Sequence, residues 1–163
     1  MPQGIIQNEA TARDSKERGR VLALDLGAKR VGVAVSDELR LSVRALPYLP
    51  RTPWKRLLRG VAELCESFDV RLLVVGLPLR LDGVEGEAAG EARRIARNLE
   101  LSLKLPVRLQ DERLTSKAAE DSLRSRGYDG AQVAERVDGE AAAIILKDFL
   151  SASPGPGESE PRA

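Results

Sequence analysis

Short apolar runs alternate along the chain with longer stretches that have helical spacing. Three apolar segments come first, at about 21–26, 30–36 and 41–47, and their short connections predict an antiparallel meander of strands. A further run at 72–76 is fully apolar and predicts a buried strand, and another strand is predicted at 107–110. Four other stretches have apolar residues every three or four positions. They predict helices at about 53–68, 85–101, 116–126 and 137–150.

The order of these elements predicts the fold class. The middle of the chain alternates strand, helix, strand, and such crossover connections pair strands in parallel. We therefore expect an α/β fold whose sheet is antiparallel in its first part and parallel afterwards. Thr52 is expected to cap the first helix, with Pro53 at its first position.

Length and composition favour a single domain. The 163 residues, 42% of them hydrophobic, suffice for one α/β core, expected at 20–150 between disordered extensions at 1–19 and 151–163. No apolar stretch approaches the roughly 18 residues of a membrane span, and we expect a cytoplasmic protein without membrane contact. The lone Cys65 excludes a disulfide or zinc framework, and its apolar helix face indicates a small buried hydrophobe.

Asp25 is the first candidate functional residue, because it interrupts an apolar strand at 21–27 that is otherwise typical of burial on both faces. A buried carboxylate without a partner is costly, so the site must supply a cation, hydrogen bonds or water. Gly27 then turns the chain into the second strand, which places Asp25 near the mouth of a hairpin. The competing interpretation is an Asx-turn carboxylate that caps this hairpin.

Asp111 and Glu112 form a second acidic position. They come directly after a strand, at the carboxyl end where ligands bind in α/β sheets. The alternative is a polar turn in which one of them pairs with Arg113.

Asp138 is the third acidic position. It begins the last predicted helix, and apolar residues follow three, four and seven positions later, so its side chain is expected to share the face that packs on the sheet. An acid favoured by the helix dipole is the competing explanation. Glu140 and Asp148 lie off that stripe and are expected to face solvent.

Three inward acids in a chain without histidine indicate hard oxygen ligands for Mg²⁺ or Mn²⁺. Two such ions, roughly 3.5–4 Å apart, activate a water and stabilise the leaving oxygen in phosphoryl transfer. The lack of histidine also removes the usual base of Ser or Cys triads. The pattern therefore favours a nuclease with two metal ions.

The net charge of +1 does not by itself indicate a nucleic-acid-binding protein, but positive charges cluster locally. We expect phosphate contacts from these residues: Lys29, Arg30, Arg80, Arg113, Lys55, Arg56 and Arg59. Further clusters stand at 93–97 and 124–126. The alternative for any cluster is a solvated helix face balanced by nearby Glu residues. Aromatic residues are only 3% of the chain, which argues against a stacking platform for single strands.

Four segments resemble, in order, the motifs of the YqgF family. The run 24–37, LDLGAKRVGVAVSD, resembles the first motif, and 75–83 resembles the central loop. The run 111–116, DERLTS, resembles the third motif, and 137–142 resembles the last. The similarity covers about 20–150, and four ordered motifs are far more specific than one Asp-x-Gly strand.

The resemblance implies a ribonuclease H-like fold related to the RuvC resolvases: a five-stranded mixed sheet, its first three strands antiparallel, with helices on both faces. It implies that Asp25, Glu112 and Asp138 are the catalytic, metal-binding acids, with Asp111 as a further candidate ligand. The family is described as a nuclease that matures the 5′ end of pre-16S rRNA, and formerly as a Holliday junction resolvase. The implied partners are precursor rRNA and ribosomal particles, or branched DNA as the alternative, for a monomer or homodimer.

Two positions depart from the family pattern. Arg80 stands where the central loop usually carries Asn, and Gly139 stands where Ser commonly follows the last Asp. The metal-binding acids are unaffected by either change.

Two other classes of protein compete with the nuclease. A nucleotide-binding module of the actin and sugar-kinase type also opens with an Asp-x-Gly hairpin, but it needs two related domains and a second such loop, and only 25–27 has that form here. A non-catalytic ribosome-assembly or nucleic-acid-binding domain that keeps the acids for structure is the other alternative.

Overall fold

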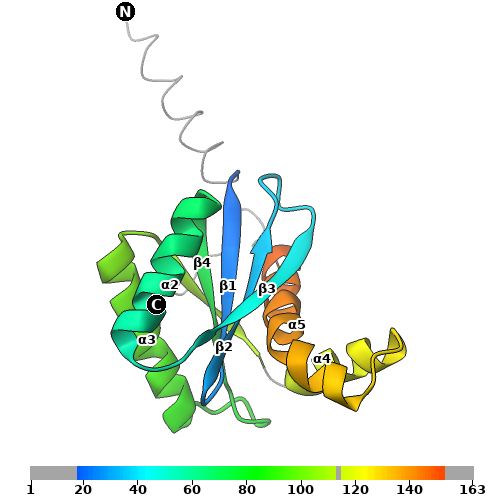
Figure 1. The fold of residues 1–163 in the computed structure, drawn as a ribbon. Coiled ribbons are helices and arrows are strands. Elements are labelled where there is room, and N and C mark those ends of the chain that lie inside the picture. The colour runs from blue at the N-terminus through cyan, green and yellow to red at the C-terminus, as the bar shows by residue number, and fades with distance from the viewer. Residues whose placement is uncertain (1–17, 113–114, 153–163) are drawn as a thin grey trace, which may run out of the picture.

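The computed structural model describes residues 18–112 and 115–152, which form a five-stranded sheet with helices on both faces (Figure 1). The strands are β1 (Arg20–Leu26), β2 (Arg30–Ser36), β3 (Val43–Pro50), β4 (Val70–Leu77) and β5 (Val107–Asp111). The sheet order is β3-β2-β1-β4-β5, antiparallel from β3 to β1 and parallel from β1 to β5. The predicted α/β class and mixed sheet are confirmed.

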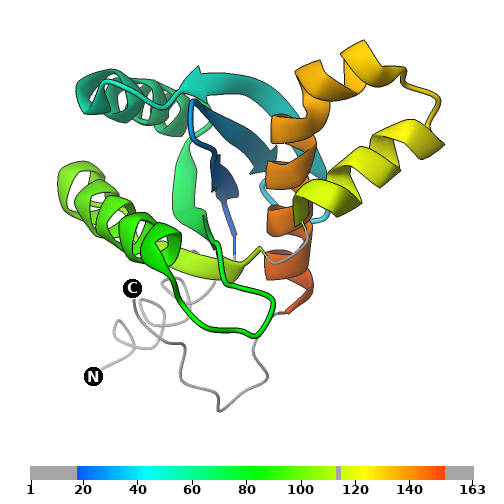
Figure 2. The same cartoon turned by 90° about the horizontal axis from the view of Figure 1, so that it is seen from below.

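The helices cover the two faces differently (Figure 2). They are α2 (Trp54–Ser67), α3 (Glu87–Leu103), α4 (Thr115–Ser125) and α5 (Gly130–Ser151). α2 and α3 lie on one face, α5 crosses the other, and α4 packs against α5 to form a hairpin that projects from the sheet. Among the described residues, no helix is long and apolar enough to cross a membrane.

Alternation along β1 divides the core between the two faces. Leu22 and Leu24 join the large cluster under α2 and α3, whereas Val21 and Ala23 join a smaller cluster under α5. Cys65 is buried in the larger cluster, as predicted. The same alternation directs Asp25 toward α5.

The largest correction concerns the last helix. α5 begins at Gly130, well before the predicted start at 137. Asp129 caps it, because its carboxylate accepts from the Gln132 backbone N–H (2.9 Å) and the Gln132 side chain accepts from the Asp129 N–H (3.0 Å). The first turns are mostly exposed, so apolar spacing did not mark them. Asp138 therefore lies in the middle of the helix, and the explanation by the helix dipole is wrong.

The third strand and the first helix also shift. β3 runs over Val43–Pro50 and not 41–47, because an edge strand tolerates proline where a central strand does not. α2 begins at Trp54 with Pro53 as its N-cap residue and has no side-chain cap, so the predicted Thr52 cap is wrong. The predicted extensions at 1–19 and 151–163 lie almost entirely outside the described residues.

The prediction that Glu140 faces solvent is wrong. Its carboxylate accepts a hydrogen bond from the Ser122 hydroxyl (3.2 Å) and pairs with Arg126 (2.9 Å), and these contacts join α4 to α5. Asp148 is exposed, as expected.

Candidate active site at the carboxyl edge of the sheet

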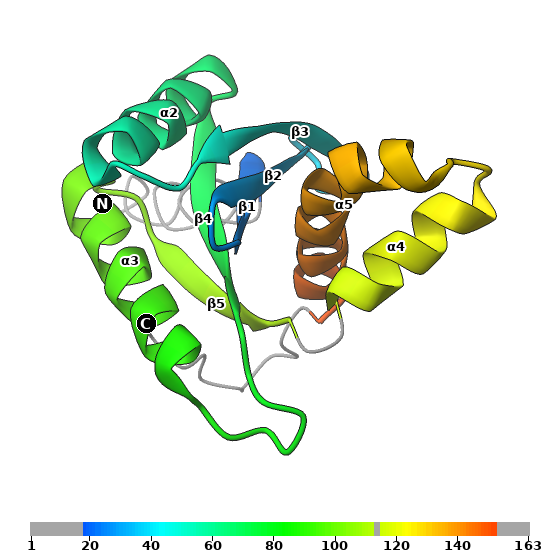
Figure 3. The ribbon, with the colours of Figure 1, turned by 60° about the horizontal axis from the view of Figure 1, so that its bottom comes forward.

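Asp25 stands near the end of β1, at the edge of the sheet where β1, β4 and β5 all end (Figure 3). Its register partner is Gly32 in β2. The turn beyond it is closed by a hydrogen bond from Gly27 N to Arg30 O (2.9 Å), and the Arg51 guanidinium donates to Gly27 O (2.9 Å). Asp25 thus lies within the hairpin strand and does not cap its turn, so its carboxylate is positioned by the sheet.

Glu112 follows β5 directly, and Gly76 of β4 makes room for it. A Cβ placed on Gly76 would lie 2.4 Å from Glu112 Oε2 and 2.8 Å from Ile145 Cδ1. The Glu112 carboxylate therefore rests on the bare backbone of β4, on the face that α5 covers. Any side chain at position 76 would displace it.

Asp138 reaches the same edge because α5 approaches the sheet very closely there. A Cβ on Gly32 would lie 2.0 Å from the Asp138 carbonyl oxygen, so the helix backbone lies directly against β2. Gly139 is also close-packed but less tightly, since a Cβ there would lie 3.2 Å from Ala45 Cβ. Because Gly32 pairs with Asp25, this contact brings Asp138 next to Asp25.

The acids influence one another's protonation. Burial is the main cause that raises the pKa of Asp25; the Glu112 hydrogen bond opposes the rise, and the charge of Asp138 adds to it. Burial, the hydrogen bond to Asp25 and the charges of Asp25 and Asp111 together raise the pKa of Glu112 to about 9. At neutral pH a protonated Glu112 therefore donates a hydrogen bond to the Asp25 carboxylate.

Asp111 lies on the other face of the sheet. Val107 and Leu109 of β5 pack into the cluster under α2 and α3, and strand alternation directs Asp111 to that side as well. Its charge acts on Glu112, but its side chain does not share the face of the other three acids.

The donor set suits a hard divalent cation. Asp25, Glu112 and Asp138 offer only carboxylate oxygens. Asp25 and Glu112 share one hydrogen bond, and the pKa of each is raised. Within the described residues, no three of these side chains already stand in metal-binding geometry. The chemistry of the residues fits Mg²⁺ or Mn²⁺, and binding requires Glu112 to lose its proton.

The predicted nucleic-acid contacts fall into two groups. Lys29 and Arg30 are exposed at the β1–β2 turn, beside Asp25, and Arg80 is exposed in the loop after β4 at the same edge. Three exposed basic residues lie in the first two turns of α2, which begins at this edge: Lys55, Arg56 and Arg59. Arg113 lies outside the described residues.

Several other arginines hold the fold together. Arg51 pairs with Glu91 on α3 (2.7 Å), and Arg93 binds Glu85 in the loop after β4, with Nε at 2.8 Å from the carboxylate. Arg126 is committed to Glu140. Of the predicted nucleic-acid contacts, Arg80 is also ion-paired, with Asp82 of its own loop (3.7 Å). Sequence clustering alone did not identify which basic side chains have acidic partners.

Tyr48 is a residue that the sequence did not single out. It lies in β3, with its side chain 45% exposed, and the Arg30 guanidinium stacks over its ring at 4.5 Å from the centroid. The low aromatic content hid it, and only the register of β3 on β2 brings Tyr48 to Arg30.

The chain is similar in sequence to curated proteins that are named as putative nucleases. It is 44% identical over 131 residues to a protein of Anaeromyxobacter sp. (strain K) named "Putative pre-16S rRNA nuclease", covering 80% of this chain and 96% of that one. A relative with the same name from Syntrophus aciditrophicus (strain SB) is 43% identical over 133 residues, covering 82% and 89%.

Solved structures show the same fold at low sequence identity. T. thermophilus RuvC in complex with a Holliday junction substrate has a TM-score of 0.51 at 16% identity, covering 82% of this chain and 97% of that chain. The fowlpox virus Holliday junction resolvase has a TM-score of 0.50 at 13% identity, covering 82% and 99%. The family model described as "RuvX: Holliday junction resolvase" matches residues 19–152. The chain therefore belongs to the RuvX (YqgF) Holliday junction resolvase family, as its four ordered motifs predicted.

Proposed function

We propose that this chain is a divalent-metal-dependent nuclease that hydrolyses phosphodiester bonds, with residues 20–150 as its catalytic domain. One observation carries the proposal. Acids from three separate elements, Asp25 of β1, Glu112 after β5 and Asp138 of α5, converge on one edge of the sheet, and each raised pKa there reflects burial and the neighbouring acids. Folding alone does not require such a costly arrangement.

The three acids would hold two Mg²⁺ or Mn²⁺ ions. Bound there, the ions would supply the Lewis acidity that activates the attacking water and stabilises the leaving oxygen. Glu112 would release the proton that it shares with Asp25, so that both carboxylates bind as anions. Gly76 and Gly32 keep the space for Glu112 and Asp138. Asp111, directed to the other face of the sheet by strand alternation, would stay outside the ligand set.

Basic and aromatic side chains beside the acids would hold the substrate. Arg30 and Tyr48 form an exposed pair on β2 and β3, where a phosphate can bind the guanidinium and a base can stack on the ring. The loop after β4 is a small hairpin closed by hydrogen bonds from Arg80 N to Val84 O (3.0 Å) and from Gly83 N to Arg80 O (2.8 Å). It presents Arg80 and Leu81 to solvent at the same edge.

We propose precursor 16S rRNA as the substrate, because curated relatives at 43–44% identity are named "Putative pre-16S rRNA nuclease". Cleavage at its 5′ end is proposed from the resemblance to the YqgF family. This activity would place the protein in the cytoplasm, in contact with ribosomal particles during ribosome biogenesis. The second candidate is resolution of four-way DNA junctions, favoured by the description of the matching family.

The test is a cleavage assay on paired substrates at equal salt: precursor 16S rRNA and a four-way DNA junction, each with Mg²⁺, Mn²⁺, Ca²⁺ or a chelator. We expect faster cleavage of the RNA with Mg²⁺ or Mn²⁺. Calcium should bind without supporting cleavage, because its longer and looser coordination misplaces the reacting oxygens.

Other outcomes of this assay decide between the alternatives. A rate that strongly favours the junction would assign the resolvase activity. Cleavage that survives exhaustive chelation would disprove the metal-dependent mechanism. Absence of cleavage on both substrates, with binding retained, would favour the non-catalytic ribosome-assembly domain.

A further inference from the structure

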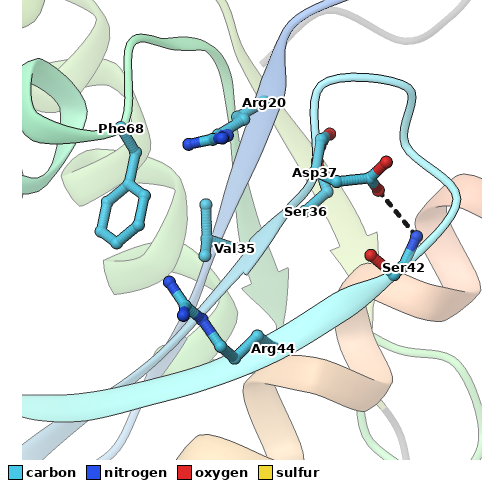
Figure 4. A pocket seen from close by; sticks show the side chains of 7 residues that line it. All are labelled: Arg20, Val35, Ser36, Asp37, Ser42, Arg44 and Phe68. Carbon is cyan, nitrogen blue, oxygen red and sulfur yellow. Dashed lines mark hydrogen bonds between the residues drawn. The ribbon is translucent and has the colours of Figure 1, made fainter.

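A hollow of about 290 Å³ opens at the end of the sheet opposite to the acids (Figure 4). It lies where β1 begins and β2 ends, on the face covered by α2 and α3, so the sheet separates it from Asp25 and Glu112. Val35 of β2 lies between two arginines, Arg20 of β1 and Arg44 of β3, and Phe68 at the end of α2 forms the opposing wall.

The two arginines converge on one aromatic ring. The Arg20 and Arg44 guanidinium carbons lie 5.8 and 5.6 Å from the Phe68 centroid. Strand register produces this arrangement. Val35 of β2 pairs with Arg44 of β3 on one side and with Leu22 of β1 on the other, and Arg20 lies two residues before Leu22. Neither guanidinium has a carboxylate within ion-pair distance among residues 18–112 and 115–152, whereas the nearby Arg71 pairs with Asp69 (3.4 Å).

Asp37 also lines the hollow, but its carboxylate is engaged elsewhere. It accepts hydrogen bonds from the backbone N–H groups of Ser42 and Leu41, both at 2.7 Å, within the β2–β3 turn. Figure 4 shows the Asp37 carboxylate turned toward Ser42 and away from the guanidinium groups. The charge that remains to be balanced in the hollow is therefore positive.

We propose that this hollow is a second ligand site, which binds the phosphate of a nucleotide between Arg20 and Arg44. Guanidinium groups hold phosphate oxygens through paired, charge-assisted hydrogen bonds. The hollow is larger than a phosphate needs, and its remaining walls, the Phe68 ring and the Val35 methyl groups, suit a base or a ribose. The phosphate can come from a free nucleotide or from the end of a nucleic-acid strand.

The experiment is calorimetric titration of the full chain with adenosine monophosphate and with inorganic phosphate, in chelator so that the acids hold no cation. The test variant is Arg44→Gln, whose side chain is exposed and outside the core. The matched control is Arg71→Gln at the same end of the sheet, because that arginine is ion-paired and does not line the hollow. We expect Arg44→Gln to weaken adenosine monophosphate binding at least about tenfold and the control to bind as the wild type does.

A second variant tests the aromatic wall. Phe68→Leu keeps an apolar side chain at the end of α2, so it should weaken adenosine monophosphate binding several-fold and leave phosphate binding unchanged. Thermal unfolding of each variant verifies that it is folded. Absence of adenosine monophosphate binding by the wild type at millimolar concentration, or equal weakening by Arg44→Gln and Arg71→Gln, would overturn the proposal.

A third titration identifies the source of the phosphate. A short single strand with a 5′ phosphate that binds more tightly than adenosine monophosphate, and loses this advantage in Arg44→Gln, would assign the site to a strand end. Equal or weaker binding of the strand would assign it to a free nucleotide. The Asp25→Asn protein should bind both probes as the wild type does, so this site can be judged even if the proposed nuclease activity is absent.

Discussion

The two faces of the sheet are built differently, and the difference separates stability from chemistry. The face under α2 and α3 buries large side chains such as Leu24, Leu57 and Leu73 in one extended cluster. The cluster under α5 is smaller, and alanines make up half of its buried residues: Ala23, Ala34, Ala142 and Ala143. Small residues let α5 approach the sheet backbone, and this close approach brings Asp138 to Asp25.

This contrast predicts where substitutions act. Burial of a leucine side chain contributes about 1.5–3 kcal/mol, and an alanine contributes much less, so the face under α2 and α3 supplies most of the stability. The face under α5 holds the acids and the glycines beside them, Gly32 and Gly76. Changes there should affect activity first.

Asp25→Asn should have the largest effect. The fold should persist, and cleavage should fall at least about a thousandfold, because in the proposed mechanism the loss of one metal-binding carboxylate removes several kcal/mol of transition-state stabilisation. Without metal, the variant should melt at or above the wild-type temperature, since one source of repulsion among the acids is gone. Turnover with Mg²⁺ and thermal unfolding with and without chelator measure both effects.

The matched control for Asp25→Asn is Asp148→Asn. Asp148 is an exposed acid near the end of α5, far along the helix from Asp138. This control variant should retain wild-type activity. An Asp25→Asn protein that unfolds, or that cleaves at the wild-type rate, would show that Asp25 has a structural role only.

Gly32→Ala should separate the two faces most clearly. The added methyl would lie 2.0 Å from the Asp138 carbonyl oxygen, so α5 must move away from β2. We expect a loss of about 3 kcal/mol in the free energy of unfolding, together with a loss of activity, because Asp138 moves with the helix. Chemical denaturation and the cleavage assay measure the two losses.

Gly60→Ala is the control on the opposite face. Its Cβ would lie 3.0 Å from Leu49 Cδ2, the end of a flexible side chain, and alanine favours the helix by about 1 kcal/mol over glycine. Its stability should therefore stay within about 1 kcal/mol of the wild type, with activity unchanged. Equal losses in both variants would mean that the close approach at Gly32 has no special importance.

How much of the site could be predicted differs from residue to residue. Asp25 stands out because an acid within an apolar strand is recognisable in the sequence. The pattern after the fifth strand leaves Asp111 and Glu112 open, and only the resemblance to the family selects Glu112. Asp138 was identified for a partly wrong reason, since the exposed first turns of α5 concealed the true start of the helix. Gly32 and Gly76 could not be recognised, because the need for glycine arises only when the helix and the Glu112 side chain meet the sheet.

Side-chain contacts that depend on strand register could not be predicted from the sequence either. Arg30 meets Tyr48, and Arg20 and Arg44 both reach Phe68, only after the strands align, and nothing in the local sequence encodes these distances. The order of apolar runs, by contrast, depends on local pattern alone. The pattern was therefore sufficient for the α/β fold and insufficient for the basic surface.

The acid pair should also make stability depend on pH in the metal-free protein. Glu112 has a pKa of about 9 in the folded state and an ordinary, lower pKa when unfolded, so the folded state binds the extra proton between these values. The free energy of unfolding should therefore fall as the pH rises from about 5 to about 9. Glu112→Gln, which carries no titrating proton, should flatten this decline in denaturation experiments in chelator. An unchanged slope would show that Glu112 is ionised in the folded protein.

The smallest expected effect concerns the basic residues on the helices that cover the other face of the sheet, α2 and α3. Arg56 is exposed on α2 without an ion-pair partner among the described residues, whereas Arg93 on neighbouring α3 is bound to Glu85. Arg56→Gln should weaken nucleic-acid binding a few-fold and lower the slope of log K against log salt by about one, without changing which bond is cut. Arg93→Gln should leave the slope unchanged, because its charge is already neutralised. Binding isotherms at several salt concentrations measure both slopes, and equal slopes in the two variants would exclude this face of α2 from the nucleic-acid path.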